Sequence, residues 1–212
     1  MFNVLGYSKL WDRDRICNTL DVHKFKRVIN IGASHSQNDW AEKYTTHFVD
    51  IVKPTEANQG LNSKISFYGD ICEPEIWEEI LLDVEKNGKF DFSICTHVLE
   101  DVVNPHYVCR MLGKISKHGY ITTPSKFAEL KRREDEWRGY FHHRWIFNIE
   151  NKGVMAYPKL NALEYIIALN LIDTSNIEHI EELQIVWTDD IKIGKNNNGI
   201  IDQDVWNGLL ND

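Results

Sequence analysis

Several features that would place this 212-residue chain in familiar protein classes are missing from it. Its four cysteines are widely spaced and form no C-x-x-C pair, which excludes a zinc ribbon and a disulfide framework and suits a reducing compartment. No apolar run approaches the about 18 residues of a membrane-spanning helix. The N-terminus lacks a basic start followed by an apolar stretch, so no signal peptide is expected. We therefore expect a cytoplasmic protein without a membrane partner.

Basic residues are also fewer than acidic residues. Lys and Arg number 24 against 32 Asp and Glu, which gives a formal net charge of −8. Such a molecule repels a nucleic-acid backbone as a whole, so nucleic acid is a disfavoured partner. The composition is otherwise that of a globular protein, with 42% hydrophobic and 26% charged residues. We expect residues 1–212 to form a single domain.

Short apolar runs alternate with helical patterns through residues 25–125. The strand candidates are 28–31, 46–51, 64–68, 90–95 and 119–122. The helix candidates are 38–44, 74–84 and 105–116. Strands that alternate with helices favour βαβ units. The predicted fold class is therefore α/β, with a doubly wound, mostly parallel sheet.

The remainder of the chain is expected to complete this core. Residues 1–24 are predicted as a helical segment, and 126–160 as an insertion that opens with a charged helix and contains a hairpin over 144–157. Residues 161–212 are predicted to complete the sheet. The elements expected there are a helix over 160–171, antiparallel edge strands over 183–187 and 191–193, and a final helix over 202–210.

Ligands of an open α/β sheet bind beyond the carboxyl ends of its strands, so the residues after each apolar run are informative. Gly32 follows the first strand, but Ser34 and Gln37 stand where a dinucleotide fingerprint needs glycines. A cofactor without phosphates does not impose that demand. Asp50 ends the second strand eighteen residues later, where a carboxylate accepts from two ribose hydroxyls.

The next two strands end in further polar residues. Asp70 and Ile71 follow the third strand and are placed to bracket the edge and face of an adenine. Thr96 and His97 follow the fourth strand. As a structural alternative, the two aspartates merely cap strand ends and His97 is an ordinary hydrogen-bonding residue.

The segments INIGAS, FVDI, YGDI, FDFSICTHVLEDVVNP and KISKHGYITTP resemble the successive motifs of class I S-adenosylmethionine-dependent methyltransferases. The resemblance spans about residues 25–125 and implies a Rossmann-like methyltransferase fold with S-adenosylmethionine as cofactor. The resemblance implies that Gly32, Ala33 and Ser34 line the methionine part of the cofactor and that Asp50 holds the ribose. It further implies that Asp70 and Ile71 contact the adenine, and that Thr96 and His97 lie near the transferable methyl group.

Two departures from this family stand out. Asn30 replaces the acid that usually precedes the glycine loop, and the loop itself has bulkier residues than the family's. Both point to weaker cofactor binding, or to a degenerate domain that retains the fold as a binding or scaffold module.

An aromatic and basic segment, WRGYFHHRW at 137–145, follows the fifth strand. Methyltransferases of this class build acceptor specificity there, so Arg138, Tyr140 and Arg144 are expected to contact the acceptor. TPSKFAEL and RGYFHHRW are similar to small methyltransferases of glycan assembly, including those encoded by large algal viruses, some of which methylate deoxyhexoses such as rhamnose. The implied function is methyl transfer to a hydroxyl of a small-molecule or glycan acceptor. A nucleic-acid or protein methyltransferase is the alternative enzyme.

An oxygen nucleophile must lose its proton, and His97, Asp101, His142 and His143 are the candidate bases. Adjacent histidines in an extended chain point to opposite sides, so His142 and His143 are not expected to share a metal unless they lie in a loop. One of them with Asp101 is a candidate site for Mg²⁺ or Mn²⁺, an ion that some sugar methyltransferases of this fold use. The sequence leaves the acceptor, the metal requirement and the oligomeric state open.

Overall fold

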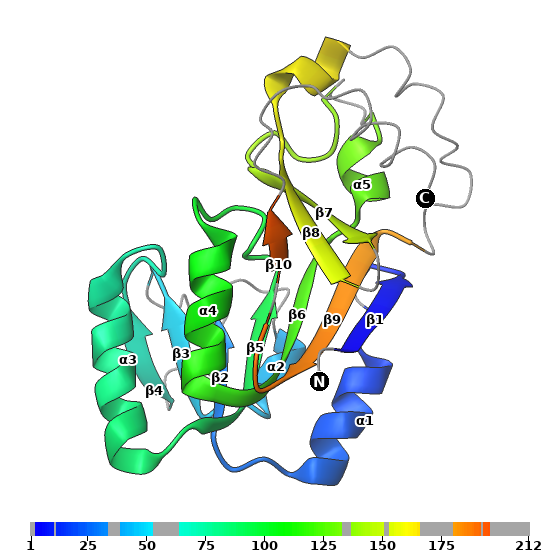
Figure 1. Ribbon diagram of the computed structural model, residues 1–212. Coiled ribbons are helices and arrows are strands. Elements are labelled where there is room, and N and C mark those ends of the chain that lie inside the picture. The colour runs from blue at the N-terminus through cyan, green and yellow to red at the C-terminus, as the bar shows by residue number, and fades with distance from the viewer. Residues whose placement is uncertain are drawn as a thin grey trace.

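The computed structural model describes residues 3–10, 12–33, 39–52, 64–132, 137–150, 153–165, 180–191 and 193–195. Its main sheet has seven strands in the order β1-β9-β6-β5-β2-β3-β4 (Figure 1). The strands are β1 (Asn3–Ser8), β2 (Val28–Ile31), β3 (His47–Asp50), β4 (Ile65–Tyr68), β5 (Phe90–Thr96), β6 (Ser116–Pro124) and β9 (Glu182–Thr188). Five of them match the strands expected from the sequence to within three residues at either end.

The central strands β4, β3, β2, β5 and β6 run parallel, whereas β9 is antiparallel to both β6 and β1. From β2 the chain builds outward through β3 to β4 on one side, and β5 and β6 lie on the other side. The order therefore reverses between β2 and β5, which is the switch point at which sheets of this type bind ligands. The predicted fold class, α/β with a doubly wound, mostly parallel sheet, is confirmed.

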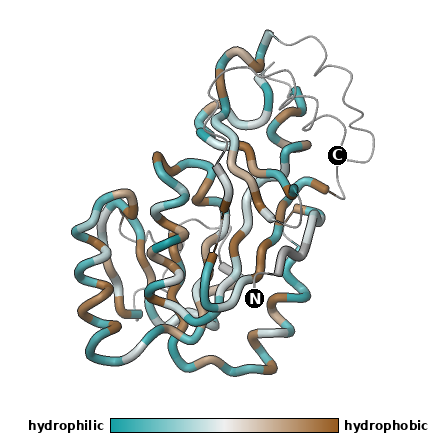
Figure 2. The backbone as a smooth tube through the Cα atoms, in the orientation of Figure 1, coloured by the Kyte–Doolittle hydropathy of each residue, from teal (hydrophilic) through white to brown (hydrophobic). Residues whose placement is uncertain are grey.

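Helices cover both faces of this sheet (Figure 1). α1 (Asp14–His23) and α2 (Asp39–Glu42) cover one face, and α3 (Pro74–Asn87) and α4 (Pro105–Ile115) cover the other. Figure 2 shows hydrophobic and hydrophilic residues alternating along α3 and α4, as expected of helices with one buried side. Among the described residues, no helix is both long enough and apolar enough to cross a membrane.

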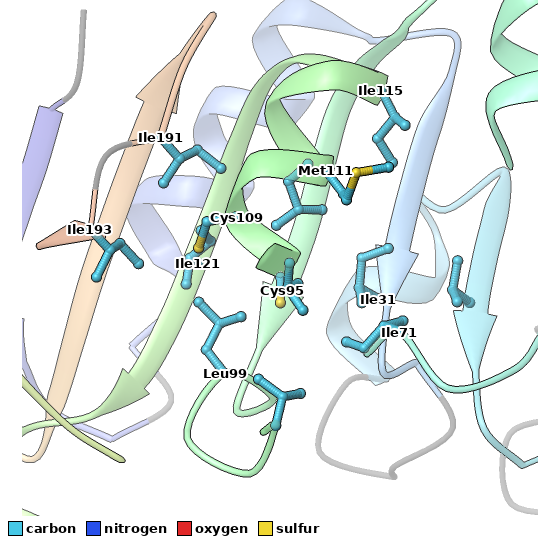
Figure 3. Close-up of a cluster of buried hydrophobic side chains, with 14 of the residues drawn as sticks. Ile31, Ile71, Cys95, Leu99, Cys109, Met111, Ile115, Ile121, Ile191 and Ile193 are labelled. Carbon is cyan, nitrogen blue, oxygen red and sulfur yellow. The ribbon is translucent and has the colours of Figure 1, made fainter. Parts of the chain in front are cut away.

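The larger core cluster lies between the sheet and α3 and α4. Figure 3 shows Cys109, Met111 and Ile115 of α4 in one cluster with Cys95 of β5 and Ile121 of β6, and Cys109 lies next to Ile121. All five are buried. Because each fully buried aliphatic side chain contributes about 1.5–3 kcal/mol, this packing holds the carboxyl end of β5 in a fixed place.

A second sheet has the order β10-β8-β7. β7 (Trp145–Glu150) and β8 (Gly153–Pro158) form the predicted antiparallel hairpin, and Phe147 bridges to Ser125 just beyond β6. The expectation of two late antiparallel edge strands needs correction. β9 is antiparallel but lies inside the main sheet, and β10 (Ile193–Lys195) pairs parallel to β8 in the second sheet.

Three other expectations differ from the structure. The first 24 residues contain β1 as well as α1, and Gly6 (φ 101°) interrupts the apolar pattern that would have marked a strand. The charged helix shortens to α5 (Lys126–Leu130), and the described part of the predicted helix 160–171 is the 3₁₀ turn η3 (Asn161–Tyr165). The predicted helix over 202–210 lies outside the described residues.

Candidate active site

Gly32 marks the place where the segments after β2 and β5 meet. Its φ of 70° is in the left-handed region, and its N–H donates to the Val49 carbonyl at 2.8 Å. A Cβ at this position would lie 2.4 Å from Cγ2 of Val98, so only glycine allows the two segments to approach this closely. Ala33 is buried against Phe48. Ser34, expected beside them, lies outside the described residues.

The acids predicted for the cofactor lie at neighbouring strand ends. Asp50 is buried at the end of β3, and its Oδ1 accepts from the Val52 N–H at 3.0 Å. Asp70 is exposed beyond β4, and its Oδ1 accepts from the Cys72 N–H at 2.8 Å. Ile71 follows directly, and its side chain is buried as part of the larger core cluster; its contact with an adenine stays a prediction.

Two buried polar side chains near the switch point lack hydrogen-bond partners among the described residues. Asn30 is 1% exposed, one residue before the end of β2, and neither its Oδ1 nor its Nδ2 is paired there. Oγ1 of Thr122 in β6 is also buried and has no hydrogen-bond partner among the described residues, and Thr122 lies directly opposite Thr96 of β5. An unsatisfied buried polar group costs about 1–3 kcal/mol, so these atoms favour a polar ligand at this end of the sheet.

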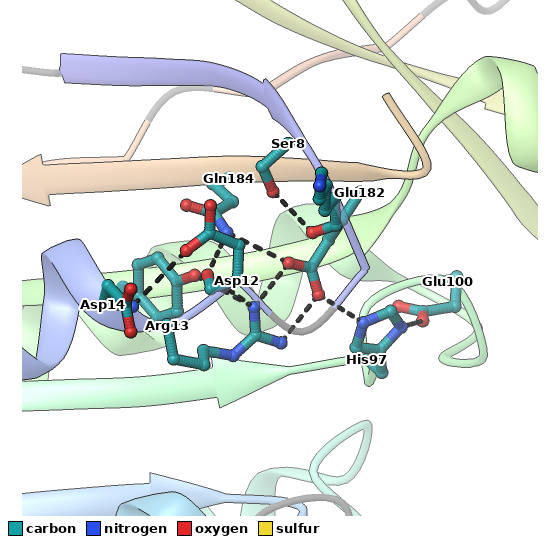
Figure 4. Close-up of polar contacts among 10 residues, drawn as sticks. Ser8, Asp12, Arg13, Asp14, His97, Glu100, Glu182 and Gln184 are labelled. Atoms are coloured by element: carbon teal, nitrogen blue, oxygen red, sulfur yellow. Dashed lines mark hydrogen bonds and ion pairs between the residues drawn. The ribbon is translucent and has the colours of Figure 1, made fainter. Parts of the chain in front are cut away.

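His97 lies in a buried network of charges just beyond β5. Its Nε2 is 2.7 Å from Oε1 of Glu182 and its Nδ1 is 3.2 Å from Oε1 of Glu100 (Figure 4). Both oxygens of Glu182 also accept from the guanidinium of Arg13, at 2.5 and 2.7 Å. The network ties the carboxyl end of β5 to β9 and to the residue that precedes α1.

This network changes the role expected of His97. Burial by itself would lower its pKa, but the contacts and charges of Glu100 and Glu182 outweigh burial and raise the pKa to about 9. His97 is therefore an imidazolium at neutral pH and has no lone pair with which to accept a proton. The expectation that His97 acts as the general base is corrected: it is a buried cation between two carboxylates.

The backbone brings the aromatic segment against the end of β5. The carbonyl of Glu100 accepts from the N–H of Arg144 at 2.7 Å and of Trp145 at 3.2 Å. The indole N–H of Trp145 donates to the Val102 carbonyl at 2.8 Å. These bonds join two segments more than forty residues apart in sequence. They place Asp101 beside the histidines of the aromatic segment.

Asp101, His142 and His143 form one cluster in which the ligand atoms all lie within 4.8 Å of one another. Nε2 of each histidine is 3.9 Å from Oδ1 of Asp101. The expectation that the two histidines point apart is wrong for this conformation: a turn at residues 141–142 leaves their rings 4.5 Å apart and nearly perpendicular. Burial and the Glu100 carboxylate raise the pKa of Asp101.

His143 is held by a buried acid that the sequence analysis did not select. Its Nδ1 is 2.5 Å from Oε1 of Glu129, and Oε2 of Glu129 accepts from Nζ of Lys159 at 2.6 Å. A carboxylate bonded to an ammonium is ionised and only accepts, so Nδ1 of His143 carries the proton. Nε2 of His143, which faces Asp101, is then the nitrogen with a free lone pair.

The three residues expected to contact the acceptor have different surroundings. Arg138 is 1% exposed, and its guanidinium donates to the carbonyls of Leu130 and Leu163 at 2.9 and 3.1 Å. It thus holds α5 and η3 together, which corrects its expected role at the acceptor. Tyr140 is half-buried with its ring 4.7 Å from that of His143, and Arg144 is exposed.

Glu129 and Lys159 carried no usable signal in the sequence. Glu129 lies in a segment dense with charges, which is typical of a solvent-exposed helix, yet its side chain is fully buried. Glu182 opens a strand more than eighty residues after His97. Only the folded chain brings these acids to the two histidines.

Comparisons with known proteins find similarity to solved structures only at low sequence identity. No protein-family model and no curated protein sequence matches the chain. Among solved structures, the methyltransferase domain of bacterial CtHen1-CN is 10% identical, over 84% of this chain and 100% of that chain, with a TM-score of 0.48. The N-terminal domain of EvdMO1 with SAH bound is 14% identical, over 85% and 82%, with a TM-score of 0.44. Thermoplasma acidophilum 1320 is 14% identical, over 82% and 85%, with a TM-score of 0.43.

Proposed function

We propose that the protein transfers a methyl group from S-adenosylmethionine to a hydroxyl of a small-molecule or glycan acceptor. The observation that carries this proposal is the pair of hydrogen bonds from Arg144 and Trp145 to the Glu100 carbonyl. They hold the aromatic segment and its two histidines next to the carboxyl end of β5. Ligands of this type of sheet bind at that end, beside the switch point.

The strand ends fit a nucleoside cofactor that has an amino-acid part. Asp50 offers a carboxylate at the end of β3, the group proposed to accept from the ribose hydroxyls. The Asn30 amide offers one donor and one acceptor that are both unpaired among the described residues. Gly32 allows the chain to turn closely beside Val98. When bound, the cofactor supplies an electrophilic methyl group on a sulfonium. The work left to the chain is to align the acceptor with that methyl carbon and to remove the acceptor's proton.

His143 is the base that the geometry supports. Glu129 fixes its tautomer, so Nε2 is free to take the hydroxyl proton as the new carbon–oxygen bond forms. Glu129 then stabilises the imidazolium, and the proton leaves to solvent after transfer. A divalent cation at Asp101, such as Mg²⁺ or Mn²⁺, is the alternative to this base: it would lower the pKa of the hydroxyl itself, and Nε2 of His143 would then be a ligand of the cation and not the proton acceptor.

The surface around the cluster suits a sugar. Phe141 is 77% exposed and Trp137 is 51% exposed. Exposed aromatic rings in the same segment as the polar groups of Tyr140 and Arg144 suit the apolar and hydroxyl faces of a pyranose, as in a deoxyhexose. A basic surface for a nucleic-acid backbone would instead need more Lys and Arg than a chain of net charge −8 supplies.

Calorimetry with S-adenosylhomocysteine tests the cofactor. We expect saturable binding that Asp50→Ala weakens by about 1–3 kcal/mol, because a charged acceptor of two hydroxyls is lost. Asp21→Ala, which removes an exposed carboxylate on α1, is the matched control and should leave the affinity unchanged. Absence of binding at millimolar ligand would refute the methyltransferase proposal and favour a scaffold.

Mass spectrometry of reactions with a panel of free and nucleotide-linked sugars, RNA and peptides tests the acceptor. We expect a mass gain of one methyl group on a sugar, and none on RNA or peptide. His143→Gln should lower kcat by about 10²–10⁴-fold if Nε2 takes the proton. Tyr140→Ala and Arg144→Ala should instead raise the acceptor KM and leave cofactor affinity unchanged. Methylation of RNA or peptide alone would overturn the acceptor assignment.

A further inference from the structure

We propose that Asp101, His142 and His143 bind one divalent transition-metal ion, with Glu129 as the outer partner that orients His143. The class of ion is one that prefers imidazole ligands, such as Zn²⁺ or Co²⁺, rather than Mg²⁺. The proposal takes the alternative in which a cation activates the hydroxyl, so that Nε2 of His143 is a ligand of the ion and not the base. Its use in methyl transfer therefore rests on the proposed function, whereas binding of the ion does not.

The donor set decides the class of ion. Two imidazole nitrogens and one carboxylate oxygen converge, and these are the ligand atoms within 4.8 Å of one another. Mg²⁺ and Ca²⁺ prefer sets made only of oxygen, whereas imidazole suits Zn²⁺, Fe²⁺, Ni²⁺ and Cu²⁺. Two histidines and one carboxylate leave coordination positions open, which is the pattern of a catalytic rather than a structural ion.

One ligand is fixed and two are able to move. His143 is buried, and Glu129 and the ring of Tyr140 hold its imidazole in place. His142 and Asp101 are about half exposed, with side-chain exposures of 52% and 45%. With bonds of about 2.1 Å, ligand atoms around one ion lie about 3–3.5 Å apart. The two Nε2–Oδ1 distances of 3.9 Å therefore close by small rotations of the exposed side chains.

The surroundings of His143 are those of a metal ligand. A histidine that binds a metal through one nitrogen typically donates the other N–H to a carboxylate, which orients the ring and increases its basicity. Glu129 does this from a fully buried position and is itself held by Lys159. Gly139 makes room for that acid, because a Cβ there would lie 2.5 Å from Oε2 of Glu129.

The 212-residue chain, without an affinity tag and dialysed against chelator, provides the test. Calorimetry with Zn²⁺ should give one ion per chain, and added Co²⁺ should produce a visible absorption band from nitrogen and oxygen ligands. Mg²⁺ in excess should displace neither ion. His142→Ala and Asp101→Asn change exposed side chains, so both should fold and bind at least tenfold more weakly.

Two further variants separate ligation from chance binding. Glu129→Gln should weaken affinity by about 10–100-fold, the usual effect of losing an outer partner. His23→Ala removes an imidazole at the end of α1, remote from the cluster in sequence, and should leave affinity unchanged. Binding that His142→Ala and Asp101→Asn leave intact, or that Mg²⁺ competes away, overturns the proposal. If the wild-type chain binds S-adenosylhomocysteine but no metal ion, only the metal-site proposal is refuted. If it binds the metal ion but no S-adenosylhomocysteine, only the methyltransferase proposal is refuted.

Discussion

The raised pKa of His97 predicts that the protein loses stability in mildly alkaline solution. A pKa that rises from 6.5 to about 9 on folding means that the native state binds the proton more tightly than the unfolded chain does. The corresponding stabilisation is fully present below about pH 6.5 and disappears as the pH rises through about 9. At about 1.4 kcal/mol for each of the 2.5 pH units, it amounts to at most about 3.5 kcal/mol. The 17% of the side chain that stays exposed makes this an upper bound.

The substitution that isolates this effect is His97→Asn. His97 has a φ of 53°, in the left-handed region where asparagine is among the best-tolerated residues, so the change removes the charge with little added backbone strain. The free energy of unfolding is measured from denaturant titrations at pH 6, 7, 8, 9 and 10, followed by tryptophan fluorescence. The difference between wild type and variant should be largest at pH 6 and decrease by up to about 3.5 kcal/mol by pH 10.

A difference that stays constant from pH 6 to pH 10 would refute this reasoning, because His97 would then bind its proton equally well in both states. The same variant also separates structure from catalysis. If His97 is a buried cation and not the base, His97→Asn leaves the pH dependence of kcat in place. Loss of the basic dependence would instead return His97 to the list of candidate bases.

Three further predictions concern packing. Gly139→Ala should lower the midpoint of thermal unfolding by several degrees, because the new Cβ meets the backbone of α5 at Glu129 and φ is 57°; an unchanged midpoint would contradict the close approach. Burial raises the pKa of the Cys95 and Cys109 thiols, so a thiol reagent at pH 8 should label neither in the native protein, and rapid labelling of either would show that the core opens. Ser125 is the N-cap of α5, and its Oγ accepts from the Ala128 N–H at 3.2 Å. Ser125→Ala should therefore lower the free energy of unfolding by about 0.5–2 kcal/mol, whereas Ser125→Thr, which keeps the hydroxyl, should retain most of the wild-type stability.

The sequence by itself determined the parallel core. Each of the five central strands is a short apolar or β-branched run bounded by polar residues. The pattern alternates with helices, and such local periodicity is readable without any tertiary contact. The end of each apolar run marks the end of a strand, so the sequence alone locates Gly32, Asp50, Asp70 and Thr96 at the ligand-binding edge of the sheet. The sequence does not predict β1, because Gly6 breaks its apolar pattern. Its partner strand β9 lies at the far end of the chain, so the pairing leaves no local signal.

Only the tertiary structure decided what the polar residues do. His97 is suited to a base by residue type, yet Glu182 and Glu100 make it a cation, and Glu182 comes from a strand at the far end of the sequence. Asp101, His142 and His143 meet because backbone bonds from Arg144 and Trp145 end on a single carbonyl. The proton affinity and orientation of a side chain depend on charges and donors a few ångströms away, and their distance along the chain is arbitrary. The sequence therefore identifies the candidate polar side chains, and the fold determines their protonation state and their contacts.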